Sequence, residues 1–502
     1  MKRFAIALLI LMFLYCSLTQ LASMAMVVSD AKLEKSKWVV DDLIMVEKAN
    51  DFQISPDCRW VVWVKNTPDK DKGEYIANLM LSSLTEKKDI ELTRSNDENE
   101  QPKWSMDGQM IAFTSTRKIP KTKSDSGGEE GKDDDESKPQ LWLMHPFGGE
   151  PWALTDLKRG VKQHEWVDAE TIIFSAQEDH SNYESNIKEK KDTSIVVDDE
   201  PHAPPVRLFQ VSVKTKKIKR LTDNTDRIQL FAVSPDGNYV VAVHERSLRF
   251  VYDNRVKPAV FLHNLKTGET RAIFTETKFN ITEVRWTKDS KGFYAINAFT
   301  THPQYVHATI NQLYYFDLAA GISTQIELDW ENGISSDLAI TDNGFVTLLA
   351  NGARNVTAHY RRDGSNWRKE VLTGEQARNI FAMKVGKDNR TIVYNYSTAS
   401  LPSQWYRAQI VDGRIDTPTQ ITDINQHFKK RTIAKTEVIR WKGALDEEVE
   451  GILYYPHNYQ SGKKYPLVVM IHGGPAGADF DSWDDTWFYP QNFFNEREAF
   501  VL

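Results

Sequence analysis

Short stretches of alternating hydrophobic and polar residues recur along most of the chain, and each follows a turn of similar sequence. The clearest copies are FQISPDCRWVVWV (52–64), PKWSMDGQMIAFTS (102–115) and VSPDGNYVVAV (233–243). Asp and Gly suit such a turn because the Asp side chain can bond to nearby backbone N–H groups and Gly tolerates positive φ. The alternating run that follows the turn predicts a half-buried or buried β-strand.

Weaker copies of this pattern extend the repeat to seven. The turn aspartates are Asp57, Asp107, Asp168, Asp236, Asp289, Asp342 and Asp388. Strands ending in an aliphatic residue and Thr, such as Leu92-Thr93 and Leu154-Thr155, run in phase with these turns. Four strands in about 50 residues make a blade that cannot bury both faces alone, so blades stack around an axis. We therefore expect a mainly β fold with a seven-bladed β-propeller over residues 45–427.

Two of the repeats are longer than the others. Residues 117–139 are charged, rich in Ser and Gly, and lack apolar periodicity, which predicts a loop between strands. Residues 178–205 form a second excursion, whose short apolar run at 195–197 predicts that it lies against the folded domain.

The N-terminus has the build of a secretory signal peptide. Lys2 and Arg3 precede an apolar run, and the small residues Ser23 and Ala25 stand at the −3 and −1 positions for cleavage after Ala25. The apolar run is shorter than the about 20 residues that cross a bilayer. We expect residues 1–25 to be removed on export to the periplasm or the extracellular space, leaving 26–44 as an N-terminal segment, with no other membrane attachment.

Composition narrows the partners and cofactors. The 502 residues include 63 Lys and Arg against 70 Asp and Glu, a net charge of −7, so there is no basic excess for a nucleic-acid backbone. Cys16 and Cys58 are the only cysteines, which excludes a disulfide framework and a cysteine-rich metal site. We expect no metal, no cofactor and no nucleic-acid partner.

After the last repeat the pattern changes. Residues 433–455 read as two strands joined by a turn at 442–447, and the apolar strand Leu467–Ile471 then runs directly into His472-Gly473-Gly474-Pro475. A fully apolar strand that ends in a Gly-Gly turn is typical of a buried parallel strand ending at a ligand-facing loop. In α/β-hydrolases such a loop supplies a backbone N–H to the oxyanion hole, because only Gly lets the backbone approach the intermediate closely. An ordinary strand-to-loop turn is the alternative.

The order of these features resembles the prolyl oligopeptidase family (S9) of serine peptidases, and most closely its acylaminoacyl-peptidase and dipeptidyl-peptidase branch. The features are a signal peptide, seven repeats of the PD40/TolB-like type, a strand pair ending GILYYP, and KYPLVVMIHGGP. The resemblance implies a C-terminal α/β-hydrolase domain with Ser, Asp and His in that chain order, short peptide substrates, and a propeller that caps the active site. It also implies that His472, Gly473, Gly474 and Pro475 form the oxyanion-side loop. Whether His472 donates a hydrogen bond or braces the loop stays open.

The sequence departs from the family at one important point, because residues 1–502 contain no G-x-S-x-G. We expect a helix at 491–498 and the beginning of the next strand at 499–502, so that 433–502 would be the N-terminal part of a truncated hydrolase domain. No catalytic triad is assigned to this chain, which we expect to be inactive. Ser105, Ser234 and Asp236 belong to propeller turns.

Three functions fit these features to different degrees. The first is a serine-type exopeptidase or oligopeptidase that hydrolyses short peptides through an acyl-enzyme in the complete protein; a homo-oligomer of that enzyme is compatible with it. The alternative is a non-catalytic periplasmic propeller that binds proteins. A carboxylesterase would fit the His-Gly-Gly loop and leave the propeller unexplained. The choice between acylaminoacyl, dipeptidyl and prolyl specificity is not encoded in these residues.

Overall fold

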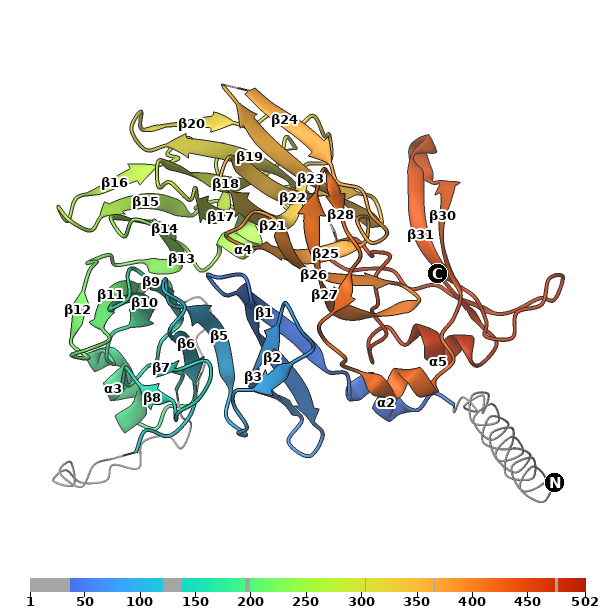
Figure 1. Cartoon of the computed structure of the whole chain (residues 1–502), viewed down its shortest axis with the longest axis horizontal. Helices are drawn as coiled ribbons and strands as arrows, with labels where there is room; N and C mark the ends of the chain where they lie inside the picture. Colours follow the sequence, from blue (N-terminus) through green and yellow to red (C-terminus); the bar gives the residue numbers. More distant parts are fainter. Residues whose placement is uncertain (1–36, 121–137, 195–198, 303, 365, 475–476) are drawn as a thin grey trace, which may run out of the picture.

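The structure is a computed structural model that describes residues 37–120, 138–194, 199–302, 304–364, 366–474 and 477–502. The predicted signal peptide at 1–25, most of the charged insertion, the apolar run at 195–197 and Pro475 lie outside the described residues. The rest folds mainly into β-strands arranged as a ring of sheets, with a smaller C-terminal part beside it (Figure 1).

Within each of the first three blades the strands are antiparallel, and neighbouring strands follow one another in the chain. Blades 3 and 4 are joined into one eight-stranded sheet by a single parallel residue pair, Val206 and Arg227. Blade 1 comprises β1 (Lys48–Ile54), β2 (Trp60–Asp69), β3 (Glu74–Ser83) and β4 (Asp89–Glu91). Blade 2 comprises β5 (Asn99–Trp104), β6 (Ile111–Ser115), β7 (Gln140–Met144) and β8 (Trp152–Ala153). Blade 3 comprises β9 (Gln163–Trp166), β10 (Thr171–Gln177), β11 (Val206–Ser212) and β12 (Ile218–Arg220).

The other four blades repeat this plan. Blade 4 comprises β13 (Arg227–Val233), β14 (Tyr239–Glu245), β15 (Ala259–Asn264) and β16 (Thr270–Ile273), and blade 5 comprises β17 (Ile281–Trp286), β18 (Gly292–Phe299), β19 (Ile310–Asp317) and β20 (Ile322–Gln325). Blade 6 comprises β21 (Ile334–Thr341), β22 (Gly344–Asn351), β23 (Arg354–Asp363) and β24 (Asn366–Val371). Blade 7 comprises β25 (Ile380–Val385), β26 (Thr391–Thr398), β27 (Leu401–Val411), β28 (Arg414–Ile415) and β29 (Thr419–Gln420).

The ring closes because the first and last blades meet. The first strands of successive blades are neighbours from β1 to β25, and β25 in turn neighbours β1. Phe52 of blade 1 stacks on Trp405 of blade 7 with ring centroids 3.7 Å apart, and the Trp405 indole donates to the Ala49 carbonyl at 3.0 Å. The prediction of a mainly β fold with seven repeats is confirmed, and the closed ring of sheets is consistent with a β-propeller.

The repeated turn has the same hydrogen bonds in different blades. In blade 2 the Ser105 hydroxyl donates to Asp107 at 2.6 Å, and the same carboxylate oxygen accepts from the Gln109 N–H at 3.1 Å. Ser234 and Asp236 repeat this arrangement in blade 4. These bonds satisfy the polar groups of a tight hairpin turn, which explains why the sequence repeats Ser and Asp at this spacing.

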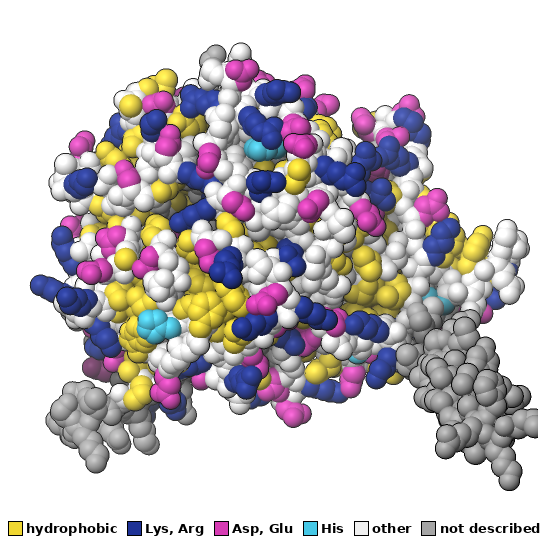
Figure 2. All heavy atoms as spheres, viewed as in Figure 1, with side chains coloured by type: hydrophobic (Ala, Val, Ile, Leu, Met, Phe, Trp, Pro, Cys, Tyr) yellow, Lys and Arg dark blue, Asp and Glu magenta, His cyan; other side chains and the backbone are white. Residues whose placement is uncertain are grey.

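Tryptophans join neighbouring blades. The indole N–H of Trp104 donates to the Gln53 carbonyl of the preceding blade at 3.0 Å, and that of Trp286 donates to Ala232 at 3.0 Å. Each indole therefore packs in an interface between two sheets while its one donor is satisfied. Charged side chains of both signs are spread over the outer surface shown in Figure 2, in keeping with the nearly balanced composition.

The C-terminal part is a four-stranded mixed sheet. It comprises β30 (Thr436–Lys442), β31 (Glu448–Tyr454), β32 (Leu467–Val468) and β33 (Phe500–Val501), in the spatial order β30-β31-β33-β32. β30 and β31 form the predicted antiparallel pair, with the 3-10 turn η3 (Ala444–Asp446) between them. β33 is parallel to β32 and antiparallel to β31.

Two sequence expectations for this part need correction. The apolar strand predicted at 467–471 is shorter, Leu467–Val468, and its apolar residues are exposed, Leu467 by 54% and Ile471 by 82%, as expected for a strand that lacks further sheet neighbours. The reason is that β32 is the edge strand of the sheet among the described residues. The predicted helix is shorter, α5 (Gln491–Asn495), and the chain leaves the helical conformation at Glu498, whose φ is +60°.

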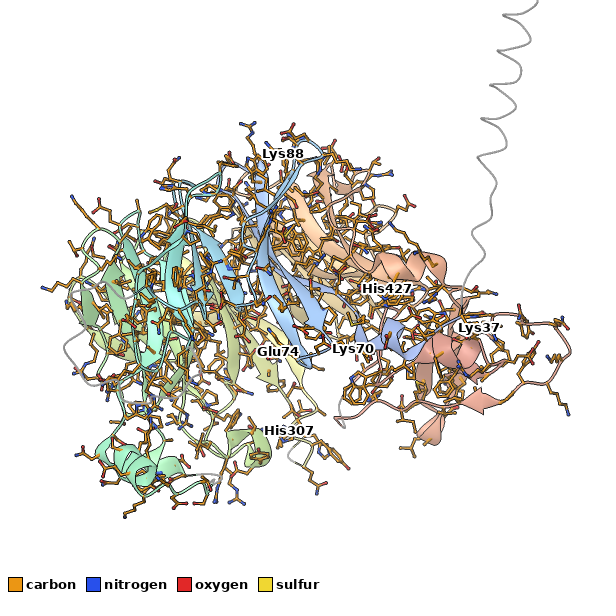
Figure 3. The ribbon with its side chains drawn as sticks, turned by 90° about the horizontal axis from the view of Figure 1, so that it is seen from below. Lys37, Lys70, Glu74, Lys88, His307 and His427 are labelled. Atoms are coloured by element: carbon orange, nitrogen blue, oxygen red, sulfur yellow. The ribbon has the colours of Figure 1, made fainter. Side chains whose placement is uncertain are left out.

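The remaining helices are short, and one of them links the two parts. They are α2 (Val40–Ile44), α3 (Asn182–Glu189), α4 (Phe250–Asp253), η1 (Glu200–His202) and η2 (Gln426–Lys430). Asp42 of α2 pairs with Arg431 through two hydrogen bonds of 2.7 and 2.9 Å, and the Trp38 indole donates to the Thr432 carbonyl at 2.7 Å. Figure 3 shows Lys37 and His427 on the side where the C-terminal elements lie. None of the helices in the described ranges is long and apolar enough to cross a membrane.

Candidate functional site

The predicted oxyanion-side loop follows β32 directly. His472 is exposed, and its Nδ1 lies 3.2 Å from the Gly473 carbonyl oxygen. Gly474 has a φ of +127°, and a Cβ at Gly477 would clash with the Gly473 oxygen. Both positions therefore need glycine, the first for its backbone conformation and the second because the loop folds back on itself.

His472 lines a cavity between the C-terminal sheet and blade 6. The cavity has a volume of about 780 Å³. Its walls come from β31, from residues 469–472 and 478–484, and from the β22–β23 turn at 351–353. The exposed loop thus borders a space in which a ligand could contact both the propeller and the C-terminal sheet.

The loop can provide backbone donors. Among the described residues, neither the Gly473 nor the Gly474 N–H has an acceptor. Nothing lies within 4 Å of the position that a Cβ at Gly473 would occupy, so a ligand atom can approach this backbone closely. Free N–H groups on an accessible glycine backbone are the feature that stabilises a developing negative charge on oxygen.

The structure gives the predicted turn residues a structural role. Ser105, Ser234 and Asp236 are held in the hairpin bonds described above and contact no histidine through them. Hydrogen bonds from Ser105 and the Gln109 N–H hold the pKa of Asp107 below its ordinary value. The side chains of these residues therefore stabilise hairpin turns of the blades.

A buried Asp–His pair occurs in blade 4 but cannot serve as two members of a triad. His244 Nδ1 lies 2.7 Å from Asp226, and the His244 side chain is only 3% exposed. The Nε2 atom of His244 is buried and has no partner among the described residues. Substrate cannot reach it, so the pair is part of the blade interior.

Sequence reasoning missed two buried aspartates that follow the loop. Asp481 and Asp485 are 5% and 3% exposed. Asp481 contacts blades 6 and 7, whereas Asp485 accepts from the backbone and side chain of Asn492 in α5. Burial, together with the nearby Asp484, raises the pKa of Asp485 to about 7, although the bonds from Asn492 oppose the shift. The sequence DFDSWDD at 479–485 is rich in aspartate, but nothing in it distinguishes the buried aspartates from the exposed ones.

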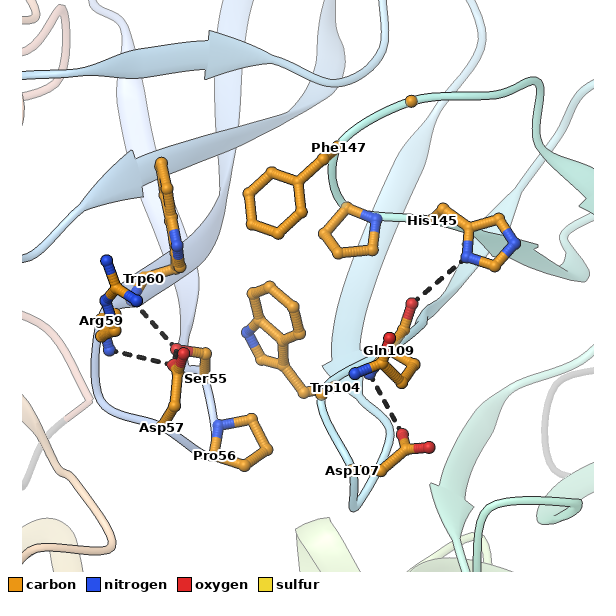
Figure 4. Close-up of a pocket in the computed structure, with 13 residues that line it drawn as sticks. Ser55, Pro56, Asp57, Arg59, Trp60, Trp104, Asp107, Gln109, His145 and Phe147 are labelled. Carbon is orange, nitrogen blue, oxygen red and sulfur yellow. Dashed lines mark hydrogen bonds between the residues drawn. The ribbon is translucent and has the colours of Figure 1, made fainter.

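A second cavity, of about 500 Å³, lies between blades 1 and 2 at the β1–β2 and β5–β6 turns. Trp60, Trp104 and Phe147 border the same space, with Asp57 and Asp107 at the turns (Figure 4). Trp60 meets Phe147 edge-on with centroids 5.1 Å apart. The C-terminal part contacts the β22–β23 and β26–β27 turns instead. Successive hairpin turns of a blade lie at opposite ends, so this cavity belongs to the other end of the blades.

Comparison with known proteins identifies relatives along most of the chain. An uncharacterised peptidase, YuxL of Bacillus subtilis, is 21% identical over 468 residues, which cover 87% of this chain and 66% of that protein. Dipeptidyl-peptidase 5 of Schizosaccharomyces pombe is 24% identical over 234 residues, covering 46% of this chain and 32% of that protein. No protein-family model matches the sequence.

Solved structures of similar fold are also peptidases. Pyrococcus horikoshii acylaminoacyl peptidase superposes with a TM-score of 0.67 at 16% identity, over 93% of this chain and 66% of that one. A puromycin-hydrolysing peptidase of Mycobacterium tuberculosis gives 0.61 at 14% identity, over 93% and 68%. At such identities the likeness establishes the fold alone.

The relatives found by sequence are peptidases as well. The chain is related over most of its length to the prolyl oligopeptidase family of serine peptidases, to which acylaminoacyl peptidases and dipeptidyl-peptidase 5 belong. It spans just under two thirds of the length of YuxL.

Proposed function

We propose that this chain forms the N-terminal part of an exported serine peptidase that hydrolyses short peptides, with residues 433–502 as the first part of its α/β-hydrolase domain. The observation that carries the proposal is the glycine loop at the end of β32, whose His472 borders the cavity between the C-terminal sheet and the propeller. A loop in this place can reach a peptide that lies between the two parts.

In this mechanism a serine hydroxyl attacks the scissile carbonyl while a histidine accepts the hydroxyl proton. The C–N bond then breaks, the histidine returns the proton to the leaving amine, and water hydrolyses the resulting acyl-enzyme to free the serine and the acid product. The nucleophile, the acid and the base would come from the remainder of the hydrolase domain in the complete protein. The contribution of this chain is the oxyanion side of the site. The N–H groups around Gly473 and Gly474 would stabilise the negative charge that develops on the substrate oxygen.

The arrangement of the C-terminal sheet supports this assignment. β32 and β33 are parallel neighbours, and the connection between them contains α5, as a parallel crossover requires. The outer edge of β32 leaves Leu467, Val469 and Ile471 more than half exposed. Further strands and helices of a hydrolase domain would cover this apolar surface.

The proposal predicts that the chain alone has no peptidase activity. Purified residues 26–502 should not hydrolyse aminoacyl or dipeptidyl chromogenic substrates and should not be labelled by a fluorophosphonate probe, because they hold no activated serine. A full-length acylaminoacyl peptidase treated in parallel provides the positive control. Stoichiometric labelling of a serine in this chain would refute the assignment.

The proposed export has its own test. The protein recovered from the periplasm or the medium should begin at Met26, as measured by N-terminal sequencing. Recovery of the intact N-terminus from the cytoplasm would contradict the signal-peptide assignment.

A non-catalytic binding propeller is the second candidate. The observation that favours it is the aromatic cavity between blades 1 and 2, which lies at the blade end away from the C-terminal sheet. Such a protein would not need the glycine loop beside a parallel strand pair, so the peptidase assignment explains more of the chain.

A further inference from the structure

We propose that Asp481 is a positioning residue that fixes the oxyanion-side loop to blades 6 and 7 of the propeller. The inference rests on the proposed function for its catalytic meaning, but the attachment itself follows from contacts of the described residues. Asp481 comes four residues after Gly477, at the point where the exposed loop returns to the protein interior.

The first attachment is to the β22–β23 turn of blade 6. The Asp481 backbone N–H donates to the Ala353 carbonyl at 2.8 Å. Nε and Nη2 of Arg354 both lie 2.9 Å from Asp481 Oδ2. Two adjacent residues of this turn are therefore bound by the backbone and the side chain of one aspartate.

The second attachment is to blade 7. The Ala399 N–H, in the β26–β27 turn, donates to Asp481 Oδ1 at 3.0 Å. The Asn379 amide, immediately before β25, donates to the Asp481 carbonyl at 2.8 Å. Both oxygens of this buried carboxylate are thus bonded: Oδ1 accepts from Ala399, and Oδ2 accepts from Arg354 and, at 3.3 Å, from the Asn379 amide. The charge is balanced by Arg354.

A second carboxylate reinforces the same turn. Glu450 of β31 accepts from the Ala353 N–H at 2.7 Å, so both backbone groups of Ala353 are bonded to the C-terminal part. Gly352 has a φ of +60°, which explains glycine at this position, and the Glu450 carboxylate lies against its backbone. The β22–β23 turn is therefore shaped to receive the C-terminal part.

Among the described residues, the loop is bonded to the rest of the protein on both sides, and its Phe480 also packs edge-on against Phe381 of β25 with ring centroids 5.8 Å apart. On one side, the Met470 N–H donates to the Leu502 carbonyl at 2.8 Å, which continues the ladder of β32 and β33. On the other side is Asp481. The described residues between these points, 471–474 and 477–480, are all exposed. The position of the Gly473 and Gly474 backbone therefore depends on these two sets of hydrogen bonds and on the Phe480–Phe381 contact.

Position matters because oxyanion donors act only at about 2.7–3.1 Å from the oxygen that they stabilise. Release of Asp481 would leave the loop attached to the propeller only through the Phe480–Phe381 contact, without hydrogen bonds. The propeller would then determine less strictly where the donors lie relative to a bound peptide.

The test uses Asp481→Asn in the full chain. The side chain of the introduced Asn places an N–H donor opposite the Arg354 guanidinium, where the native carboxylate places an acceptor oxygen. We expect the Asp481, Trp483 and Ala399 amides to exchange with deuterium about 10 to 100 times faster, as loss of a charged hydrogen bond implies. Spin labels at Ala478→Cys and Asp363→Cys, with Cys16 and Cys58 changed to Ser, should give a broader distance distribution in this variant.

Two further variants separate positioning from general destabilisation. Asp484→Asn removes a neighbouring carboxylate that is exposed, and it should leave both measurements unchanged. Adding Arg354→Gln to Asp481→Asn supplies an acceptor for the introduced amide and should narrow the distance distribution again. An unchanged distribution in Asp481→Asn, or faster exchange spread evenly over blades 6 and 7, would overturn the proposal. Neither measurement requires peptidase activity, so failure of the proposed function would be seen separately in the labelling experiment.

Discussion

At the residue scale, the surroundings of an aspartate decide its chemistry. Asp107 sits in an exposed turn where Ser105 and a backbone N–H bond its charged form, and its pKa is lowered. Asp485 is buried beside Asp484, and its pKa is raised to about 7 despite the bonds from Asn492. Both occur in short acidic sequences, and the sequence alone predicted only the turn aspartates, because the burial of Asp485 depends on α5 and the C-terminal sheet.

This difference predicts a pH dependence of stability. The pKa of Asp485 is 3.8 in its ordinary state and about 7 in the fold, so the folded state holds the proton more tightly. The stabilisation that proton binding at Asp485 gives to the folded state is therefore complete below pH 3.8 and is lost as the pH rises through about 7. Asp485→Asn should remove this loss and be more stable than the native chain at pH 8, by on the order of 1–4 kcal/mol.

Urea unfolding of both proteins at a series of pH values measures the effect. The difference in unfolding free energy between variant and native chain should grow across the window from 3.8 to about 7. Asp107→Asn, in an exposed turn, is the matched control and should not show this rise. Parallel pH profiles for Asp485→Asn and the native chain would contradict the assignment.

At the element scale, the repeated hairpin turn was predictable because all of its bonds are local. Its Ser, Asp and N–H groups lie within five residues of one another. The contacts of the loop after β32 were not predictable, because Arg354 precedes Asp481 by 127 residues and belongs to a different sheet. The length of the strand at 467–471 was predicted wrongly for a related reason: its apolar sequence continues to Ile471, but strand pairing depends on neighbouring strands.

Ring closure provides a second element-scale prediction. Trp405→Ala should lower the free energy of unfolding by about 3–5 kcal/mol, because it removes a buried ring from the junction of blades 1 and 7. Trp441→Ala is the control, since Trp441 is 41% exposed on β30, and it should cost much less. Urea denaturation of the two variants makes the comparison. Equal losses would mean that the Phe52–Trp405 stack contributes little to closure.

At the scale of the whole molecule, the seven-repeat plan followed from the sequence, whereas the joining of the two parts did not. The β22–β23 turn, α2 and Arg431 bind segments that are far apart in the chain. The C-terminal sheet also presents a row of exposed apolar residues along β32 and beyond. Exposed apolar strand edges promote association between chains.

That surface predicts a tendency to aggregate. Val469→Thr combined with Ile471→Thr should raise the soluble concentration of residues 26–502 without changing the blades, because the two side chains are 57% and 82% exposed. Light scattering of concentrated samples measures the change. Val251→Thr combined with Val256→Thr is the control, since both of these valines are exposed on the propeller. Equal aggregation of the Val469/Ile471 variant and the native chain would show that this edge is not responsible.

Under the proposed function this chain supplies the oxyanion side of a serine peptidase, and the nucleophile, the acid and the base come from further residues of the same protein. The most direct measurement is to read the coding DNA in frame beyond codon 502. We predict an uninterrupted reading frame that encodes a G-x-S-x-G sequence followed by an Asp and a His. A stop codon directly after Leu502, in the genome of the source organism, would contradict the proposed function.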